Sequence, residues 1–179
     1  MPPSTACKTN ILRRFRRNRR GTAAVEFALV APIFFGVLFA IIELAMVFYA
    51  SQILETATQD SARVIMTGQA QNAKYTQAQF KNLVCTKVTL MFDCLNGISI
   101  DVQSYKTFAT VDVADPIDKD KKFVPPNNYL PGGPGDIVVV RVFYKWPLFV
   151  TGFGFNLANI GSNQRLLTGT AAFQNEPYI

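Results

Sequence analysis

The sequence feature that most constrains this chain is a long apolar run that directly follows a block of arginines. Residues 27–50 contain a single charged residue, Glu43, among 24. A helix needs about 20 apolar residues to cross the hydrocarbon core of a bilayer, whereas a cleaved secretory signal has an apolar region of only about 7–15. The run therefore predicts one membrane-spanning helix that stays on the protein. Its length also argues against a twin-arginine export signal.

The arginines before this run predict its orientation. Residues 1–21 carry Lys8, no acidic residue and six arginines: Arg13, Arg14, Arg16, Arg17, Arg19 and Arg20. Because clusters of Lys and Arg beside a span remain on the cytoplasmic side, we expect the N-terminus inside and the chain after about Tyr49 outside. The formal net charge of +6 belongs to this leader, since the rest of the chain is nearly balanced. The charge is therefore not the footprint of a nucleic-acid-binding protein.

Two glutamates mark the ends of the predicted span. Glu43 falls near its outer end, where an acid is cheap, and we expect it to need no functional explanation. Glu26 lies at the inner edge. One interpretation makes it an interfacial acid that faces the headgroups or Arg20 and is favoured by the helix N-terminal dipole.

The residues around Glu26 support a second interpretation. Gly21 is followed by TAAVEF behind a short basic leader, which resembles the prepilin-peptidase site of type IV pilin-like proteins. The longer segment from Gly21 to about Arg63 is similar to the TadE-like pseudopilins of tight-adherence (Flp/Tad, type IVc) pilus systems. The resemblance implies cleavage between Gly21 and Thr22. It also implies that the new Thr22 amine pairs with Glu26 when subunits assemble.

The same resemblance implies a structural role without a cofactor. The chain would be a minor pilin-like component that joins or primes a thin pilus. Its partners would be other pilins or pseudopilins, the Tad assembly platform, prepilin peptidase and the lipid bilayer. It would lie in the bacterial inner membrane, with its C-terminal domain periplasmic or extracellular. The competing hypothesis is a single-pass, membrane-anchored binding or sensor domain that keeps its basic leader.

The predicted fold is a membrane-anchored α+β protein. We expect a leader over residues 1–21, a transmembrane helix and stem over 22–68, and an exported domain over 69–179. Apolar residues continue at helical spacing beyond the span, and Gly68 is a stop signal. The residues of this apolar stripe are Ile53, Leu54, Ala57, Ala62, Val64 and Ile65.

The exported domain shows a change from helical to alternating periodicity. A polar connector over residues 69–75 precedes a second helix, for which Thr76 and Gln79 form a predicted capping box. Alternating residues then predict an antiparallel sheet with the helices over one face. Its strands are expected at residues 98–103, 108–113, 136–146 and 165–174.

Cys85 and Cys94 flank the end of the second predicted helix. Both would lie outside the cytoplasm, where disulfides persist. They are therefore either bridged, which we favour, or two separate buried thiols. Two cysteines in a chain without histidine cannot fill a usual zinc site.

Little in the chain indicates catalysis. The absence of histidine removes the commonest general base. Four aspartates could gather a calcium ion, but their spacing is not that of the known loop and favours a solvated loop: Asp112, Asp115, Asp118 and Asp120. The aromatic stretch Trp146–Phe155 has two interpretations, a loop packed against the sheet or an exposed edge that meets a partner or the outer leaflet.

Overall fold

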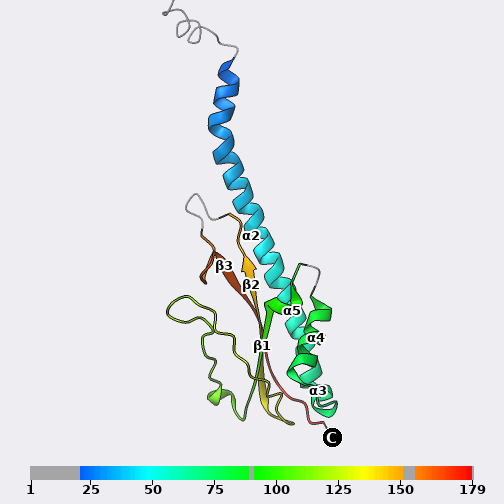
Figure 1. Cartoon of the computed structure of the whole chain (residues 1–179). Coiled ribbons are helices and arrows are strands. Elements are labelled where there is room, and N and C mark those ends of the chain that lie inside the picture. Colours follow the sequence, from blue (N-terminus) through cyan, green and yellow to red (C-terminus); the bar gives the residue numbers. More distant parts are fainter. Residues whose placement is uncertain (1–20, 89–90, 151–155, 179) are drawn as a thin grey trace, which may run out of the picture. The chain divides into compact units, whose positions relative to one another are not determined.

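The computed structural model describes residues 21–88, 91–150 and 156–178, and Figure 1 traces them in chain order. A long apolar helix is followed by short helices and a three-stranded antiparallel sheet, which confirms the predicted α+β class. The chain divides into two compact units after Ile41, so the long helix contributes to both. The elements are α2 Thr22–Met66, α3 Gln69–Asn72, α4 Gln77–Lys87, α5 Cys94–Gly97, β1 Ile98–Tyr105, η2 Phe108–Thr110, β2 Ile137–Pro147 and β3 Gln164–Gln174.

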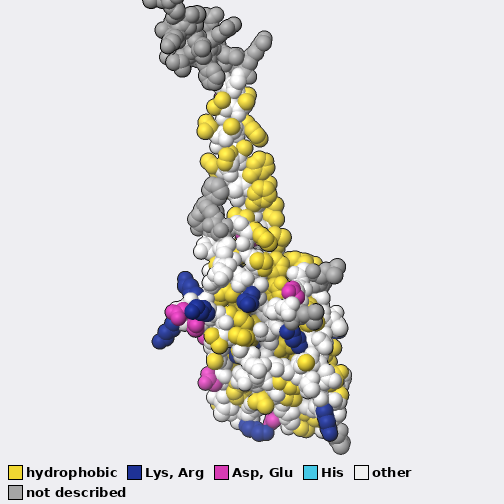
Figure 2. All heavy atoms as spheres, in the orientation of Figure 1, with side chains coloured by type: hydrophobic (Ala, Val, Ile, Leu, Met, Phe, Trp, Pro, Cys, Tyr) yellow, Lys and Arg dark blue, Asp and Glu magenta, His cyan; other side chains and the backbone are white. Residues whose placement is uncertain are grey.

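The described part of the first unit is the start of α2. Its apolar side chains are exposed on all sides of the helix, with Leu29 70% exposed. Figure 2 shows hydrophobic side chains along the visible face of this helix, with backbone atoms between them. Pro32 lies within the helix without ending it, as membrane helices tolerate. Among the described residues, α2 is the one helix long and apolar enough to cross a membrane.

The second unit begins with the rest of α2, which buries one face. Leu54, Ala57, Ala62 and Ile65 of the predicted stripe are buried. The helix ends at Met66, close to the predicted stop. Gly68 has a φ of 74°, and a Cβ there would lie 2.3 Å from the ring of Tyr178, so both conformation and space require glycine.

The sheet has the order β1-β2-β3, and both neighbouring pairs are antiparallel. The side chains of one face pack with α2 and α4 in the main hydrophobic core. From β1 and β2 these are Ile98, Ile100, Val102, Val138, Val140, Val142, Tyr144 and Trp146. The predicted strands at 98–103, 136–146 and 165–174 are therefore confirmed, with β1 running two residues further.

The long helix approaches β3 very closely. A Cβ on Gly169 would lie 2.3 Å from Thr58 Oγ1 and 2.8 Å from the carbonyl oxygen of Leu54. In addition, the Thr170 N–H donates to Glu55 Oε2 at 2.9 Å. The helix thus packs on β3 and satisfies a backbone donor of this edge strand.

The opposite face of the sheet is covered by the connection between β1 and β2. Phe143 packs there with Ile160 and Leu166, and Phe123 lies against them. The same face holds a buried ion pair between Arg141 and Asp101, which are register partners, with 2.6 Å between Nη2 and Oδ2. Arg141 also donates to the carbonyl oxygen of Ala114 at 2.8 Å.

One prediction about the exported domain is wrong. Residues 108–113 form no strand: η2 lies there, and Phe108 is 66% exposed. The reason is that the outer edge of β1 is already occupied, since Val102 exchanges backbone hydrogen bonds of 2.9 Å with Asn128 and Leu130.

The polar connector at residues 69–75 is more ordered than predicted. It contains the short helix α3, which Ala70 anchors by being buried. By contrast, the capping box of α4 is confirmed. Thr76 Oγ1 accepts from the Gln79 N–H at 3.3 Å, and Gln79 Oε1 accepts from the Thr76 N–H at 2.8 Å.

Candidate functional site

The residues of the predicted cleavage and assembly site lie at the start of α2. Thr22 is the first residue of the helix, and Glu26 follows at a spacing of four residues. Side chains at this spacing lie on the same face of a helix. Gly21, Thr22 and Glu26 are all exposed, and a Cβ on Gly21 would meet nothing within 4 Å.

Glu26 is an exposed acid in an apolar stretch. Within the part of the chain that the structure describes, its carboxylate has no hydrogen-bond or ion-pair partner. Its immediate neighbours Val25 and Phe27 are exposed apolar residues. The geometry therefore leaves the carboxylate accessible to a group outside the subunit. The six predicted topology arginines lie outside the described residues.

The predicted disulfide is present. Cys85, in α4, is bonded to Cys94, the first residue of α5, with 5.7 Å between the Cα atoms. The bond joins the end of α4 to the short helix that leads into β1. It thereby fixes the two segments on either side of residues 89–90.

Glu43 is not the unremarkable interfacial acid that we expected. Its side chain is only 3% exposed. Its carboxylate accepts hydrogen bonds from the backbone N–H groups of Phe149 and Val150, the latter at 3.1 Å to both oxygens. Hydrogen bonds to a charged group stabilise by about 1.5–3 kcal/mol each. Glu43 therefore ties α2 to the segment that follows β2.

The described part of the Trp146–Phe155 stretch is buried at its start and exposed at Phe149. Trp146 and Leu148 are buried, and the Trp146 ring lies 6.0 Å from that of Phe92. Phe149, in contrast, is 75% exposed. The stretch is therefore packed against the sheet at its start and presents an aromatic side chain at Phe149. Residues 151–155 lie outside the described residues.

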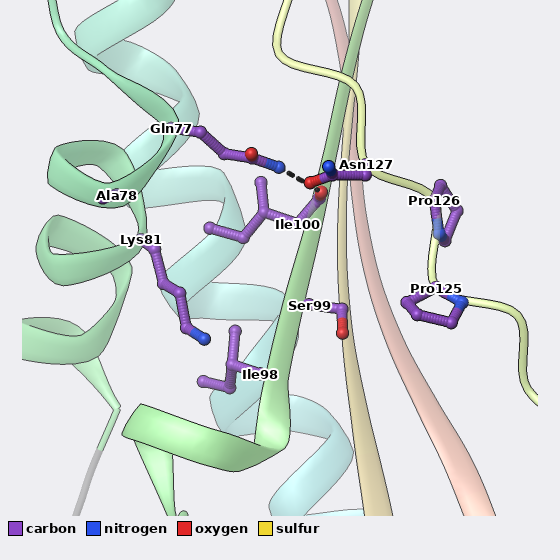
Figure 3. Close-up of a pocket in the computed structure, with 9 residues that line it drawn as sticks. All are labelled: Gln77, Ala78, Lys81, Ile98, Ser99, Ile100, Pro125, Pro126 and Asn127. Carbon is purple, nitrogen blue, oxygen red and sulfur yellow. Dashed lines mark hydrogen bonds between the residues drawn. The ribbon is translucent and has the colours of Figure 1, made fainter.

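A cavity of about 500 Å³ opens between α4, β1 and residues 125–127. Figure 3 shows its lining side chains, and Gln77 Nε2 there donates to the carbonyl oxygen of Ile100 at 3.3 Å. Ile98, Pro125 and Pro126 make much of its wall apolar. The lining therefore combines apolar walls with a few polar groups, as is common in sites that bind peptides or small ligands.

The four aspartates of the loop before β2 do not gather at one point. Asp118 Oδ1 accepts from the N–H groups of Asp120 and Lys122 at 3.0 and 2.7 Å, and Asp115 Oδ1 accepts from that of Ile117 at 2.9 Å. These carboxylates stabilise turns of their own loop. Across residues 21–88, 91–150 and 156–178, no group of three His, Cys, Asp or Glu is placed to hold a metal.

Among the described residues, three side chains have a shifted pKa, all away from the N-terminal site: Tyr129, Asp136 and Tyr178, whose pKa is raised by burial. Burial, with a smaller contribution from Tyr75, raises the pKa of Tyr129 to about 12. A hydrogen bond from Lys106, followed by one from the Gly133 N–H, lowers the pKa of Asp136. Each shift has a local structural cause and identifies no catalytic group.

Comparison with known protein families decides how the N-terminal site is classified. Residues 21–63 match the family model described as TadE-like protein. Residues 21–63 are therefore TadE-like. The match begins at the predicted cleavage glycine and ends at Arg63, before α2 ends at Met66. Neither a curated protein nor a solved structure matches the chain significantly.

The matched TadE-like segment carries Gly21, Thr22 and Glu26, whereas the disulfide and the sheet lie beyond it. Sequence reasoning missed the Glu43 contacts and the Asp101–Arg141 pair, since each joins residues far apart in the chain. The close packing at Gly169 could have been predicted, because a glycine inside a predicted strand often marks the close approach of another backbone.

Proposed function

We propose that this TadE-like protein is a non-catalytic, minor pilin-like component of a tight-adherence pilus assembly system. In this proposal α2 spans the bacterial cytoplasmic membrane with the leader inside, and the sheet domain lies outside. The observation that carries the proposal is the TadE-like match over residues 21–63. The match covers most of α2, and the apolar side chains in the first half of this helix are exposed.

The proposed mechanism depends on cleavage between Gly21 and Thr22. Cleavage creates a free amine on Thr22, four residues before Glu26, which is about 6 Å along a helix at 1.5 Å per residue. When subunits pack side by side, Glu26 of one subunit accepts a hydrogen bond from the Thr22 amine of its neighbour. The exposure of both residues supports this contact between subunits.

The charge pair between Glu26 and the Thr22 amine is expected to fix the axial position of neighbouring subunits more than to raise their affinity. Two opposite charges attract strongly at low dielectric, but the cost of removing both from water offsets much of the gain. An unpaired Glu26 in the assembled state would retain that cost without the attraction. Subunits that are displaced along the helix axis are therefore disfavoured, so the pair selects one axial position.

A membrane-anchored binding or sensor domain is the second candidate. The observation that favours it is the cavity of about 500 Å³ between α4 and β1. Its apolar walls and the Gln77 amide could bind an extended peptide or a small ligand. In that case the basic leader would remain on the protein as a topology signal.

The N-terminus of the membrane-bound protein distinguishes the two candidates. The full chain is produced with an active prepilin peptidase and, in parallel, with an inactive one, and each product is sequenced from its N-terminus. The pilin-like function predicts a chain that starts at Thr22 only beside the active enzyme. A chain that starts at Met1 in both preparations would favour the anchored domain. Gly21→Val is the matched control, because it should block cleavage and leave the span unchanged.

A further inference from the structure

Phe149 stands out among the apolar side chains that follow β2. It is 75% exposed, whereas Leu148 directly before it is 6% exposed. Exposing a large aromatic ring to water is unfavourable by roughly 25 cal/mol per Å² of apolar surface. Contiguous exposed apolar patches mark surfaces that meet a partner or a membrane.

The backbone N–H groups around Phe149 have hydrogen-bond acceptors within the protein. The N–H groups of Phe149 and Val150 donate to the Glu43 carboxylate. The Leu148 N–H donates to the carbonyl oxygen of Asn163 at 3.1 Å, and Asn163 Nδ2 donates to the carbonyl oxygen of Leu148 at 3.1 Å. All three N–H groups of residues 148–150 therefore have protein acceptors.

These hydrogen bonds matter at the boundary of a bilayer, because little water is available there to replace them. Backbone groups that enter a region poor in water must find partners inside the protein. A loop at the surface of a soluble domain has no such requirement, since water supplies the partners. The N–H groups of residues 148–150 thus meet this condition.

The helix residue that binds this segment also fixes its depth. From Thr22 to Ile42 the helix rises about 30 Å, which is the thickness of a bilayer core. Glu43 follows directly, so the groups that bond to it lie at the outer boundary if α2 spans the membrane. Exposed apolar side chains continue on α2 beyond this point, at Leu44 and Phe48.

We propose that Phe149 inserts into the outer leaflet at its boundary with the headgroups and that Glu43 is the positioning residue for this contact. The partner is a phospholipid bilayer, because the segment is bonded to Glu43, which comes directly after the proposed span in the sequence. This inference rests on the membrane placement in the proposed function, but not on cleavage or pilus assembly.

Spin-label depth measurements on the full chain test this proposal. In a Cys7→Ser background, with Cys85 and Cys94 bonded, Phe149→Cys provides one free thiol for a nitroxide. The protein is placed in vesicles of phosphatidylcholine and phosphatidylglycerol, and collisions with oxygen and with a water-soluble nickel complex are compared. We expect a several-fold lower nickel accessibility at position 149 than at Phe108→Cys, a similarly exposed site.

Phe34→Cys is the reference within the proposed span, because Phe34 is exposed on α2. If label 34 is protected from nickel while label 149 is as accessible as label 108, the exported domain stands clear of the membrane and the inference is wrong. If label 34 is also accessible, the membrane placement itself is wrong, and the inference fails with it.

Variants of Glu43 test its positioning role. Glu43→Leu removes both acceptor oxygens, so the nickel accessibility of label 149 should rise toward that of label 108, while label 34 is unchanged. Glu43→Gln keeps one acceptor oxygen and should give an intermediate value. If neither variant changes the accessibility of label 149, Glu43 does not position the segment. Protease resistance of the sheet domain in each variant serves as the control for folding.

Discussion

The two halves of α2 form one continuous helix, yet their apolar side chains have different surroundings. Between Thr22 and Ile41 apolar side chains are exposed on all sides. From Glu43 to Ile65 one face is buried, and it repeats at helical spacing. A helix that is apolar all round is suited to lipid, whereas a helix with one buried face is suited to a protein core.

The buried face of the second half is also unusually small in side-chain volume. Ala50, Ala57, Ser61 and Ala62 are buried there, and Gly169 of β3 faces the same helix. Small residues on both sides allow the two backbones to approach closely. The comparison shows that the first half of the helix is suited to an apolar solvent, whereas the second half is stabilised by close packing against the sheet.

Truncating one leucine in each half should give the largest contrast. Leu54 is fully buried, so Leu54→Ala should destabilise the sheet domain by about 2–5 kcal/mol. Leu29 is 70% exposed, and Leu29→Ala should change the same quantity by less than about 0.5 kcal/mol. Denaturant unfolding in detergent micelles, followed by the fluorescence of the single tryptophan, measures both. Equal losses would contradict the division of the helix.

Adding one methyl group where α2 meets β3 should have the next largest effect. In Gly169→Ala the new Cβ must displace Thr58 and the backbone at Leu54, which should cost about 1–3 kcal/mol of unfolding free energy. Gly161→Ala is the matched control, since the nearest atom to its Cβ would be 3.7 Å away. The same unfolding measurement compares them. A neutral Gly169→Ala would mean that the helix and strand are not closely packed.

Reducing the Cys85–Cys94 bond should destabilise only the sheet domain. The bond closes a short loop, with a sequence separation of nine residues, and the chain-entropy model gives about 2–3 kcal/mol for such a loop. The measured stabilisation by engineered disulfides is often smaller than this estimate, so we place this effect third. Unfolding with and without reductant measures it, and Cys85→Ser with Cys94→Ser serves as the control. A loss in that double variant on adding reductant would point to another cause.

The smallest predicted effect depends on pH. An unfolded tyrosine has a pKa near 10, and burial raises the pKa of Tyr129 to about 12. The stability contributed by its neutral form is therefore complete below pH 10 and is lost as the pH rises from 10 to 12. Unfolding midpoints between pH 9 and 11 should fall less steeply for Tyr129→Phe. An identical slope in both proteins would contradict the assignment.

Much of this arrangement could be predicted because it depends on local sequence. The apolar run, the capping box at Thr76 and the alternation in β2 are each visible within a few residues. The disulfide required one further fact, the compartment in which Cys85 and Cys94 were expected to lie. Such features need no knowledge of which strands become neighbours.

The errors have a common physical origin in long-range pairing. The predicted strand at 108–113 failed because residues near Tyr129 occupy the edge of β1. Glu43 was misjudged because its donors are more than a hundred positions away, at Phe149 and Val150. Neither contact leaves a periodic pattern in the sequence near the residue concerned. Each contact can therefore be recognised only when the arrangement of the sheet is known.

Assembly of a Glu26→Gln variant tests the central claim most directly. This substitution keeps the shape of the side chain and removes the charge that is proposed to pair with the Thr22 amine. Asp60→Asn is the control, because it removes another exposed acid from the same helix. The amount of each protein that co-purifies with pili is compared with wild type. The account predicts normal cleavage and membrane insertion for both variants and loss of co-purification only for Glu26→Gln; wild-type levels of Glu26→Gln in the pili would contradict it.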